Sequence, residues 1–273
     1  MEILVNAGGT LGEEQSTIAQ MQFGGIDFAR VSLRSLAQFI QELNVLQMPY
    51  LYTGADHMWE VLEGPVGDLF FHTLEDPGLV ALSWYDAGAR DFYSASKPIE
   101  TLEDVEGMRI RVQDSDLMKA MVEAMGASAV PMDHSQVYSA LETGLIDAAE
   151  NNWPSYDPMR HYEAAPYYTI DEHTRVPEMQ IMAEATWERL PAEQQAVILE
   201  CARESAVYER KLWEERSRQS EERMRQAGCQ IIELSPEEKA RFREAMMPVC
   251  DEYCSGYMDI IQEITEADSG RAP

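Results

Sequence analysis

The segment from Gly107 to Asn152 limits the possible folds more than any other part of the chain. It reads GMRIRVQDSDLMKAMVEAMGASAVPMDHSQVYSALETGLIDAAENN, with short apolar runs between amphipathic stretches. The pattern predicts a strand, a helix, a short buried strand at Ala129–Pro131, a second helix and a last strand. Strands that alternate with helices are typical of α/β folds, in which ligands bind beyond the carboxyl ends of strands.

The first third of the chain shows a similar rhythm. We expect a strand at Glu2–Val5, a helix at Leu11–Phe23 and a strand at Ile26–Val31, which together would form a parallel β-α-β unit. A helix is expected at Asp56–Leu74 and an apolar strand at Leu79–Tyr85. Two sets of β-α units in one chain indicate two α/β lobes.

The last third is dominated by helices. A strand is expected at Val176–Ala183, followed by one long helix at Pro191–Ala227 that is rich in Glu, Arg and Gln. Two further helices are expected to run to about Glu266, and Ser235 caps the first of them. The tail from Ala267 is expected to be loose.

The charge of the chain limits its partners. The 273 residues carry a formal net charge of −28. No basic stripe is present that could neutralise phosphates, which argues against nucleic acid and against an anionic membrane surface. No apolar run approaches the roughly 20 residues that cross a bilayer. The N-terminus lacks the features of a signal peptide, so the protein is either cytoplasmic or its export signal is not part of this chain.

Neither the cysteines nor the histidines are spaced as metal ligands. Catalytic and nucleotide-binding signatures are also absent from the sequence. We therefore expect no metal and no cofactor. Cys250 and Cys254 stand one helical turn apart, which predicts a pair of buried thiols on one face of a helix.

Arginines at strand ends are the candidate ligand-binding groups. Arg109 and Arg111 alternate along the strand of the Gly107–Asn152 segment, and Arg90 opens another strand. An arginine in such a position can bind a carboxylate through two parallel, charge-assisted hydrogen bonds. Each could equally pair with one of the 49 acidic residues of the chain. The strand period places Arg109 and Arg111 on one face without deciding which of them faces a cleft.

Several stretches together resemble the substrate-binding proteins of TRAP (tripartite ATP-independent periplasmic) transporters, of the dicarboxylate-receptor (DctP) type. The main ones read GMRIRV, MGASAVPM and VYSALETGLIDAAEN. Shorter matches, LGEE, GIDFA, MPYL and LPAE, extend the resemblance in order over nearly the whole chain.

The resemblance implies a periplasmic-binding-protein-like fold: two α/β lobes, joined by strands and a long helix, that close over the ligand. It divides the chain into a first lobe with the long helix (residues 1–88 and 178–234), a second lobe (89–177) and C-terminal helices packed on the lobes (235–273). Members of the family also have a signal peptide, a strand and a helix ahead of the position of Glu2. We expect that this first β-α unit is missing from the chain, through truncation or processing of its N-terminus.

The resemblance also assigns ligand-binding residues. Arg111 binds the ligand carboxylate, Arg90 assists it, and Asn151 contacts the ligand. Arg109 is left as a surface residue. Ser32 lines the cleft from the first lobe.

Four further positions are carried over from the family. Glu13 and His173 are further ligand contacts. The stretches NNWPSY and DEHTRVP look most like members that bind sugar acids such as uronates. Trp153 or Tyr156 could stack on the face of a sugar, or belong to the core.

The function implied is that of a non-enzymatic, periplasmic receptor for a small organic acid, with a uronate or related sugar acid as ligand. Its lobes close by a hinge motion, and the closed receptor docks on the TRAP membrane subunits. Two alternatives stay open from the residues. One is a hydrolase or lyase acting on an acidic sugar with Asp133, His134 or His173 as base, and the other is a sensor domain for an organic acid.

Overall fold

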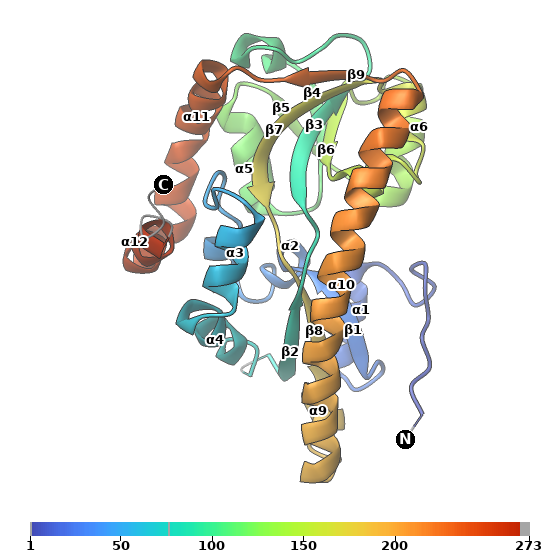
Figure 1. The fold of residues 1–273 in the computed structure, drawn as a ribbon, viewed down its shortest axis with the longest axis vertical. Coiled ribbons are helices and arrows are strands. Elements are labelled where there is room, and N and C mark those ends of the chain that lie inside the picture. Colours follow the sequence, from blue (N-terminus) through green and yellow to red (C-terminus); the bar gives the residue numbers. More distant parts are fainter. Residues whose placement is uncertain (1, 76, 268–273) are drawn as a thin grey trace.

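The chain folds into two β-sheets with helices packed around them (Figure 1). A computed structural model describes residues 2–75 and 77–267. One sheet has three strands and the other has six, and each anchors its own lobe. The tail expected to be loose lies outside the described residues, except for Ala267 at the end of a helix.

The three-stranded sheet has the order β1-β8-β2 and is antiparallel throughout. Its strands are β1 (Phe28–Ser32), β8 (Glu178–Ala183) and β2 (Leu79–Tyr85). The bounds of β2 are those predicted, because a continuous apolar run marks it clearly. This sheet belongs to a large apolar core that also receives side chains from the C-terminal helices, among them Val249 and Ile264.

The six-stranded sheet has the order β5-β4-β6-β3-β7-β9. The pairs β4–β5, β4–β6 and β7–β9 are parallel, whereas β3 runs antiparallel to both of its neighbours. The strands are β3 (Ala89–Ser94), β4 (Arg109–Val112), β5 (Ser128–Pro131), β6 (Ala148–Asn151), β7 (Tyr167–Arg175) and β9 (Gln230–Glu233).

The helices of the first half are α1 (Glu14–Gln22), α2 (Leu33–Leu36), α3 (Ala55–Leu62), α4 (Pro65–His72) and α5 (Asp116–Ala124), with 3-10 turns η1 (Gln41–Gln47) and η2 (Leu102–Val105). Those of the second half are α6 (Val137–Glu142), α7 (Trp153–Tyr156), α8 (His161–Ala164), α9 (Glu184–Trp187), α10 (Ala192–Gln226), α11 (Pro236–Cys254) and α12 (Met258–Ala267), with η3 (His134–Gln136) and η4 (Ser255–Tyr257).

The predicted parallel β-α-β unit at the N-terminus is wrong. Glu2–Val5 forms no strand, and the Leu4 and Val5 side chains are 78% and 87% exposed. A short strand is stable only beside a partner that takes up its backbone hydrogen bonds, and no described strand lies next to this segment. The following strand, β1, pairs antiparallel with β8 instead.

Three other predictions differ from the structure in detail. The helix expected at Asp56–Leu74 is two helices, because Pro65 cannot donate a helical hydrogen bond and starts α4. The strand expected at Val176–Ala183 starts after Pro177, and the nine-residue strand β7 before it was missed. The strand at Ala129–Pro131 is half exposed, because β5 lies at the edge of its sheet and pairs only with β4.

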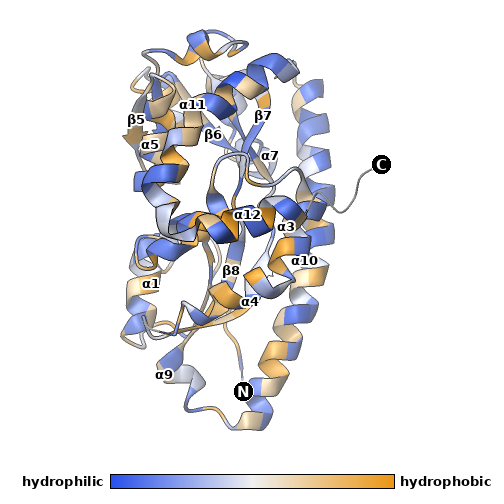
Figure 2. Cartoon of the chain, turned by 90° about the vertical axis from the view of Figure 1, so that its left-hand side faces the viewer, coloured by the Kyte–Doolittle hydropathy of each residue, from blue (hydrophilic) through white to orange (hydrophobic). Residues whose placement is uncertain are grey.

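The long helix was predicted within one residue at each end. Figure 1 shows α10 running along both sheets, and it packs against β2 of one and α7 beside the other. Hydrophilic residues dominate its upper part in Figure 2, as expected for a helix with a solvated face. None of the helices in residues 2–75 and 77–267 has the length and apolar character needed to cross a bilayer.

The start and the buried thiols of α11 also agree with prediction. The Ser235 hydroxyl accepts a hydrogen bond from the Glu238 backbone N–H at 3.2 Å and so caps the helix. Cys250 and Cys254 are free thiols, buried in the core on one face of α11.

The two sheets are joined at the middle of the molecule. The chain passes from β2 to β3 through Asp86–Gly88 and from β7 to β8 through Val176 and Pro177. The division of the chain into lobes at residues 88 and 178 stays a prediction. This junction places the start of β3 and the ends of β6 and β7 toward the lobe that holds α2.

Candidate functional site

Arg111 is a buried arginine without a carboxylate partner of its own. It lies on β4, 2% exposed. Its Nε and Nη2 both donate to the Met132 backbone carbonyl, at 2.9 and 2.6 Å, and it forms no ion pair with any described residue. Burial lowers the pKa of Arg111, but a guanidinium stays charged in proteins. An unpaired buried charge is costly unless an anion is available to it.

Arg90 has a carboxylate partner. It lies on β3, and its Nε and Nη2 donate to the two Glu150 carboxylate oxygens at 2.5 and 2.9 Å. Its Nη1 donates to the Asn151 side-chain oxygen at 2.8 Å. Of the two predicted ligand arginines, Arg90 is thus paired with a carboxylate of the protein, whereas Arg111 donates only to a backbone carbonyl.

Glu150 lies at the centre of a charged cluster that also contains Arg34, Arg90 and His173. It is fully buried at the end of β6 and also accepts from Arg34 Nη1 at 3.1 Å. Burial opposes its ionisation, but Arg34 and Arg90 outweigh that cost and hold the pKa of Glu150 well below its usual range. Glu150 is therefore an ion that orders the arginines around it.

His173 closes the cluster from β7. It is fully buried, stacks on Phe92 with ring centroids 4.3 Å apart, and has its Nε2 3.5 Å from Glu150. Its Nδ1 lies 3.0 Å from an Asp171 carboxylate oxygen. Burial lowers the pKa of His173, but the two carboxylates raise it by a larger amount, so that the pKa lies at about 9. His173 is therefore a cation at neutral pH and belongs with the arginines.

Asn151 and Ser32 lie next to this cluster. Asn151 is 5% exposed, and its side-chain oxygen accepts from Arg90 and from the Asn152 backbone N–H at 2.9 Å. The Ser32 hydroxyl accepts from the Arg34 backbone N–H at 3.3 Å and caps α2. Ser32 thus places the first turn of α2, and with it Arg34, toward the six-stranded sheet.

The structure does not bring Glu13 into the cluster. Glu13 is exposed just before α1, whereas its neighbour Glu14 accepts from the Ser35 hydroxyl at 2.6 Å and from the Ser32 backbone N–H at 3.3 Å. Glu14, one residue further along, is therefore the acidic group that contacts the Ser32 region.

The two aromatic candidates lie in or beside an aromatic core. Tyr156 is fully buried, and its hydroxyl donates to the Ala165 carbonyl at 2.7 Å. Trp153 stacks on Tyr168 with centroids 3.5 Å apart and an interplanar angle of 17°. The Tyr168 hydroxyl in turn donates to the Asn151 carbonyl at 3.1 Å. Tyr156 is a core residue, and the ring of Tyr168 lies between Trp153 and Asn151.

Arg34 belongs to the charged cluster but was not predicted from the sequence. It is 1% exposed, and no motif marks it. The available signal was an arginine three residues beyond a predicted strand in a very acidic chain. A second sign of local positive charge is His134, whose pKa is lowered to about 4 by burial and by Arg111 and Arg90. Arg109, in contrast, is partly exposed and pairs with Asp147 at 2.7 Å.

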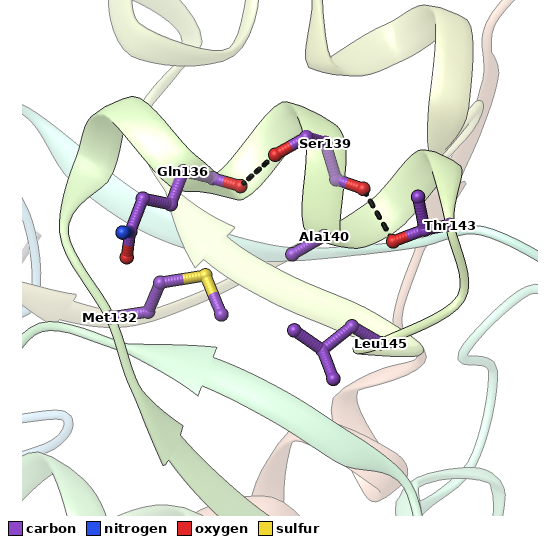
Figure 3. Close-up of a pocket in the computed structure, with 6 residues that line it drawn as sticks. All are labelled: Met132, Gln136, Ser139, Ala140, Thr143 and Leu145. Atoms are coloured by element: carbon purple, nitrogen blue, oxygen red, sulfur yellow. Dashed lines mark hydrogen bonds between the residues drawn. The ribbon is translucent and has the colours of Figure 1, made fainter.

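A cavity beside α6 adjoins the site through Met132, whose backbone carbonyl accepts from Arg111. It has a volume of about 290 Å³ and is lined by Met132, Gln136, Ser139, Ala140, Thr143 and Leu145 (Figure 3). The Ser139 and Thr143 hydroxyls are engaged by backbone carbonyls of the same helical stretch, at 3.0 and 2.7 Å. Without a charged lining residue, the cavity offers nothing that would select an anion.

The charged cluster has the groups needed to bind an anion. Two arginines, Arg34 and Arg90, and His173 surround Glu150, whereas Arg111 has no carboxylate partner among the described residues. His173 lies between Asp171 and Glu150: its Nδ1 is hydrogen-bonded to Asp171, and its Nε2 lies 3.5 Å from Glu150 without a hydrogen bond in the described chain. Among the described residues of the cluster, no hydroxyl or thiol nucleophile lies beside a free base.

Comparison with known proteins agrees with this interpretation. Residues 1–256 match the family described as bacterial extracellular solute-binding protein, family 7. A solute-binding protein from Chromohalobacter salexigens is 35% identical over 262 residues, covering 96% of this chain and 77% of that protein.

Solved structures give the same picture. A TRAP periplasmic solute-binding protein from Bradyrhizobium, in complex with D-galacturonate, is 40% identical with a TM-score of 0.91, covering 94% of this chain and 86% of that one. Another from Pseudomonas putida F1, with bound D-glucuronate, is 38% identical with a TM-score of 0.91, covering 94% and 83%. The chain therefore belongs to the DctP-type, family 7 solute-binding proteins, the periplasmic receptors of TRAP transporters.

Proposed function

We propose that this receptor binds a monocarboxylate sugar acid of the hexuronate type and holds its carboxylate on Arg111. The observation that carries the proposal is that Arg111 is 2% exposed yet has no carboxylate partner in the described chain. Its free guanidinium edge suits the two oxygens of a ligand carboxylate. A bound carboxylate would remove the cost of the unpaired charge.

The other groups of the site fit the rest of a uronate. A pyranose ring carries several hydroxyls, which can each donate and accept. Asn151 and the Arg90–Glu150 pair offer donors and acceptors on the side of the six-stranded sheet, and Ser32 and Glu14 offer them on the other side. The similar structures from Bradyrhizobium and Pseudomonas putida, which hold D-galacturonate and D-glucuronate, support the same ligand class.

Transport is the second part of the proposal. The closed receptor delivers the sugar acid to the membrane subunits of a TRAP transporter, and it does so outside the cytoplasm. The family match supports this, since the family is described as extracellular and solute-binding. Surface residues of the two lobes would make the docking contacts.

Calorimetric titration of the wild-type protein tests the ligand class. The panel is D-glucuronate, D-galacturonate, and the C4 dicarboxylates succinate and malate. We expect the two uronates to bind at least about tenfold more tightly than either dicarboxylate, a difference of about 1.4 kcal/mol. Tight binding of a dicarboxylate together with no binding of a uronate would sink the proposal.

Incubation with the same uronates distinguishes a receptor from an enzyme. After prolonged incubation at high protein concentration, the proton NMR spectrum of the bound uronate is expected to be unchanged. New sugar-acid signals that grow with time and protein concentration would instead support the lyase or hydrolase alternative. The expected result follows from His173, the candidate base, which lies between two buried carboxylates that raise its pKa to about 9 and so keep it protonated at neutral pH.

A further inference from the structure

Arg34 belongs to one lobe, but all its side-chain partners belong to the other. It lies on α2, beside the three-stranded sheet. Its Nη1 donates to Gln113 at 3.1 Å and to Glu150 at 3.1 Å, and its Nη2 donates to the Thr174 hydroxyl at 3.1 Å. Gln113 follows β4, and Glu150 and Thr174 are the next-to-last residues of β6 and β7, so the ends of three strands of the six-stranded sheet converge on one arginine.

The third nitrogen of the Arg34 guanidinium, Nε, has no hydrogen-bond partner among the described residues. This nitrogen is buried. A buried donor of a charged group without an acceptor is costly, and such groups are rare in folded proteins. An acceptor oxygen that enters the space between the lobes would relieve this cost.

We propose that Arg34 is the positioning residue that couples ligand binding to lobe closure. It fastens α2 to Gln113, Glu150 and Thr174 when the lobes approach, and it offers Nε to an oxygen of the ligand. The inference rests on the proposed function for its ligand, a hexuronate. Because these bonds form only between the two lobes, their loss should act on ligand release more than on ligand entry.

Removing Arg34 should leave the fold intact. Glu150 would keep its contacts with Arg90, at 2.5 and 2.9 Å, and with His173, at 3.5 Å, so its charge would not be left unpaired. Arg30 provides a matched control four residues earlier in the chain. It lies on β1 and pairs with Glu178 of the adjacent strand β8, so its ion pair stays within one sheet.

The test compares Arg34→Ala with Arg30→Ala and the wild type. Stopped-flow measurement with D-glucuronate should show dissociation about tenfold faster or more in Arg34→Ala, with an association rate changed by less than about threefold. Arg30→Ala should release the ligand at the wild-type rate. Arg34→Lys should behave like Arg34→Ala, since an ammonium group cannot hold three partners in the plane of a guanidinium.

Small-angle X-ray scattering of the same proteins reports closure. Arg34→Ala is expected to have a larger radius of gyration than Arg30→Ala, both with saturating D-glucuronate and without it. If Arg34→Ala matches Arg30→Ala in dissociation rate and in radius, the inference is wrong. If the wild type binds no sugar acid, the proposed function fails, and the scattering comparison without ligand still decides the role of Arg34.

A double-mutant cycle separates positioning from a general structural effect. Gln113→Ala removes one partner of Arg34 on the far lobe. We expect the effects of Arg34→Ala and Gln113→Ala on dissociation to be less than additive, because both break the same contact. Additive effects would show that Arg34 does not act across the cleft through Gln113.

Discussion

His173 carries a charge inside the protein because two carboxylates hold it there. It is fully buried between Asp171 and Glu150, and its pKa is raised from 6.5 to about 9. The folded state therefore binds its proton more tightly than the unfolded state does. The stability gained in this way is complete below pH 6.5 and is lost as the pH rises through 9.

We expect the free energy of unfolding to fall between pH 6.5 and pH 9 by an amount of the order of 3 kcal/mol from His173 alone. Urea denaturation at a series of pH values measures this. His173→Gln should be less stable than the wild type at pH 6.5 and should show a much smaller loss toward pH 9. His72→Gln, at an exposed histidine, should keep the wild-type profile.

Equal pH profiles of the wild type and His173→Gln would contradict this account of the histidine. The cluster of Arg34, Arg90 and Glu150 would then be stable without a charged imidazole beside it. The ligand site would remain, but its order would have to come from the arginines alone.

At the scale of elements, the close packing of α3 against α4 depends on one glycine. A Cβ built on Gly67 would lie 1.9 Å from the Leu62 carbonyl oxygen and 2.6 Å from its carbon, both backbone atoms. The two helices could not keep their contact around an added methyl group. Gly144 is the opposite case, because its φ of 70° is left-handed but no atom lies within 4 Å of the built Cβ.

We expect Gly67→Ala to lower the free energy of unfolding by about 3 kcal/mol, since backbone atoms must shift. Gly144→Ala should cost only about 1 kcal/mol, the strain of a left-handed residue with a Cβ. Chemical denaturation of both variants measures the difference. Equal losses would mean that α4 can move away from Leu62 at little cost.

Elements with a strong local pattern were predictable from sequence. The run Leu79–Tyr85 and the long helix α10 agree with prediction because apolar runs and helix-end residues are local signals. β7 was missed because buried polar residues, among them Asp171 and His173, interrupt its apolar pattern. Those residues belong to the buried charged cluster, so the strand pattern is interrupted where polar side chains pair with one another inside the protein.

Pairing between distant segments was not predictable from local pattern. The antiparallel pairing of β1 with β8 joins residues about 150 positions apart, and the sequence suggested a local parallel unit instead. Likewise, the sequence left open whether Arg90 and Arg111 pair with acidic residues, and it did not identify Glu150 as the partner of Arg90. Arg34 was missed because its partner Glu150 lies 116 residues further along the chain.

At the scale of the whole molecule, a very acidic chain buries three arginines near the junction of its two sheets. The net charge is −28, yet Arg34, Arg90 and Arg111 are all buried near the junction of the sheets. Only one arginine of the three lacks a carboxylate. The account therefore predicts that the ligand's carboxylate and Arg111 depend on each other.

Calorimetry with D-glucuronate and its methyl ester, which lacks the negative charge, tests this dependence most directly. The proteins are the wild type, Arg111→Ala, Arg111→Lys and the control Arg109→Ala, an arginine that pairs with Asp147 outside the cluster. We predict that both Arg111 variants weaken D-glucuronate binding by about tenfold or more, since each charge-assisted hydrogen bond contributes about 1.5–3 kcal/mol. Arg109→Ala should bind as the wild type does, and the ester should bind all four proteins with similar, weak affinity. Wild-type affinity for D-glucuronate in Arg111→Ala and Arg111→Lys would contradict the account.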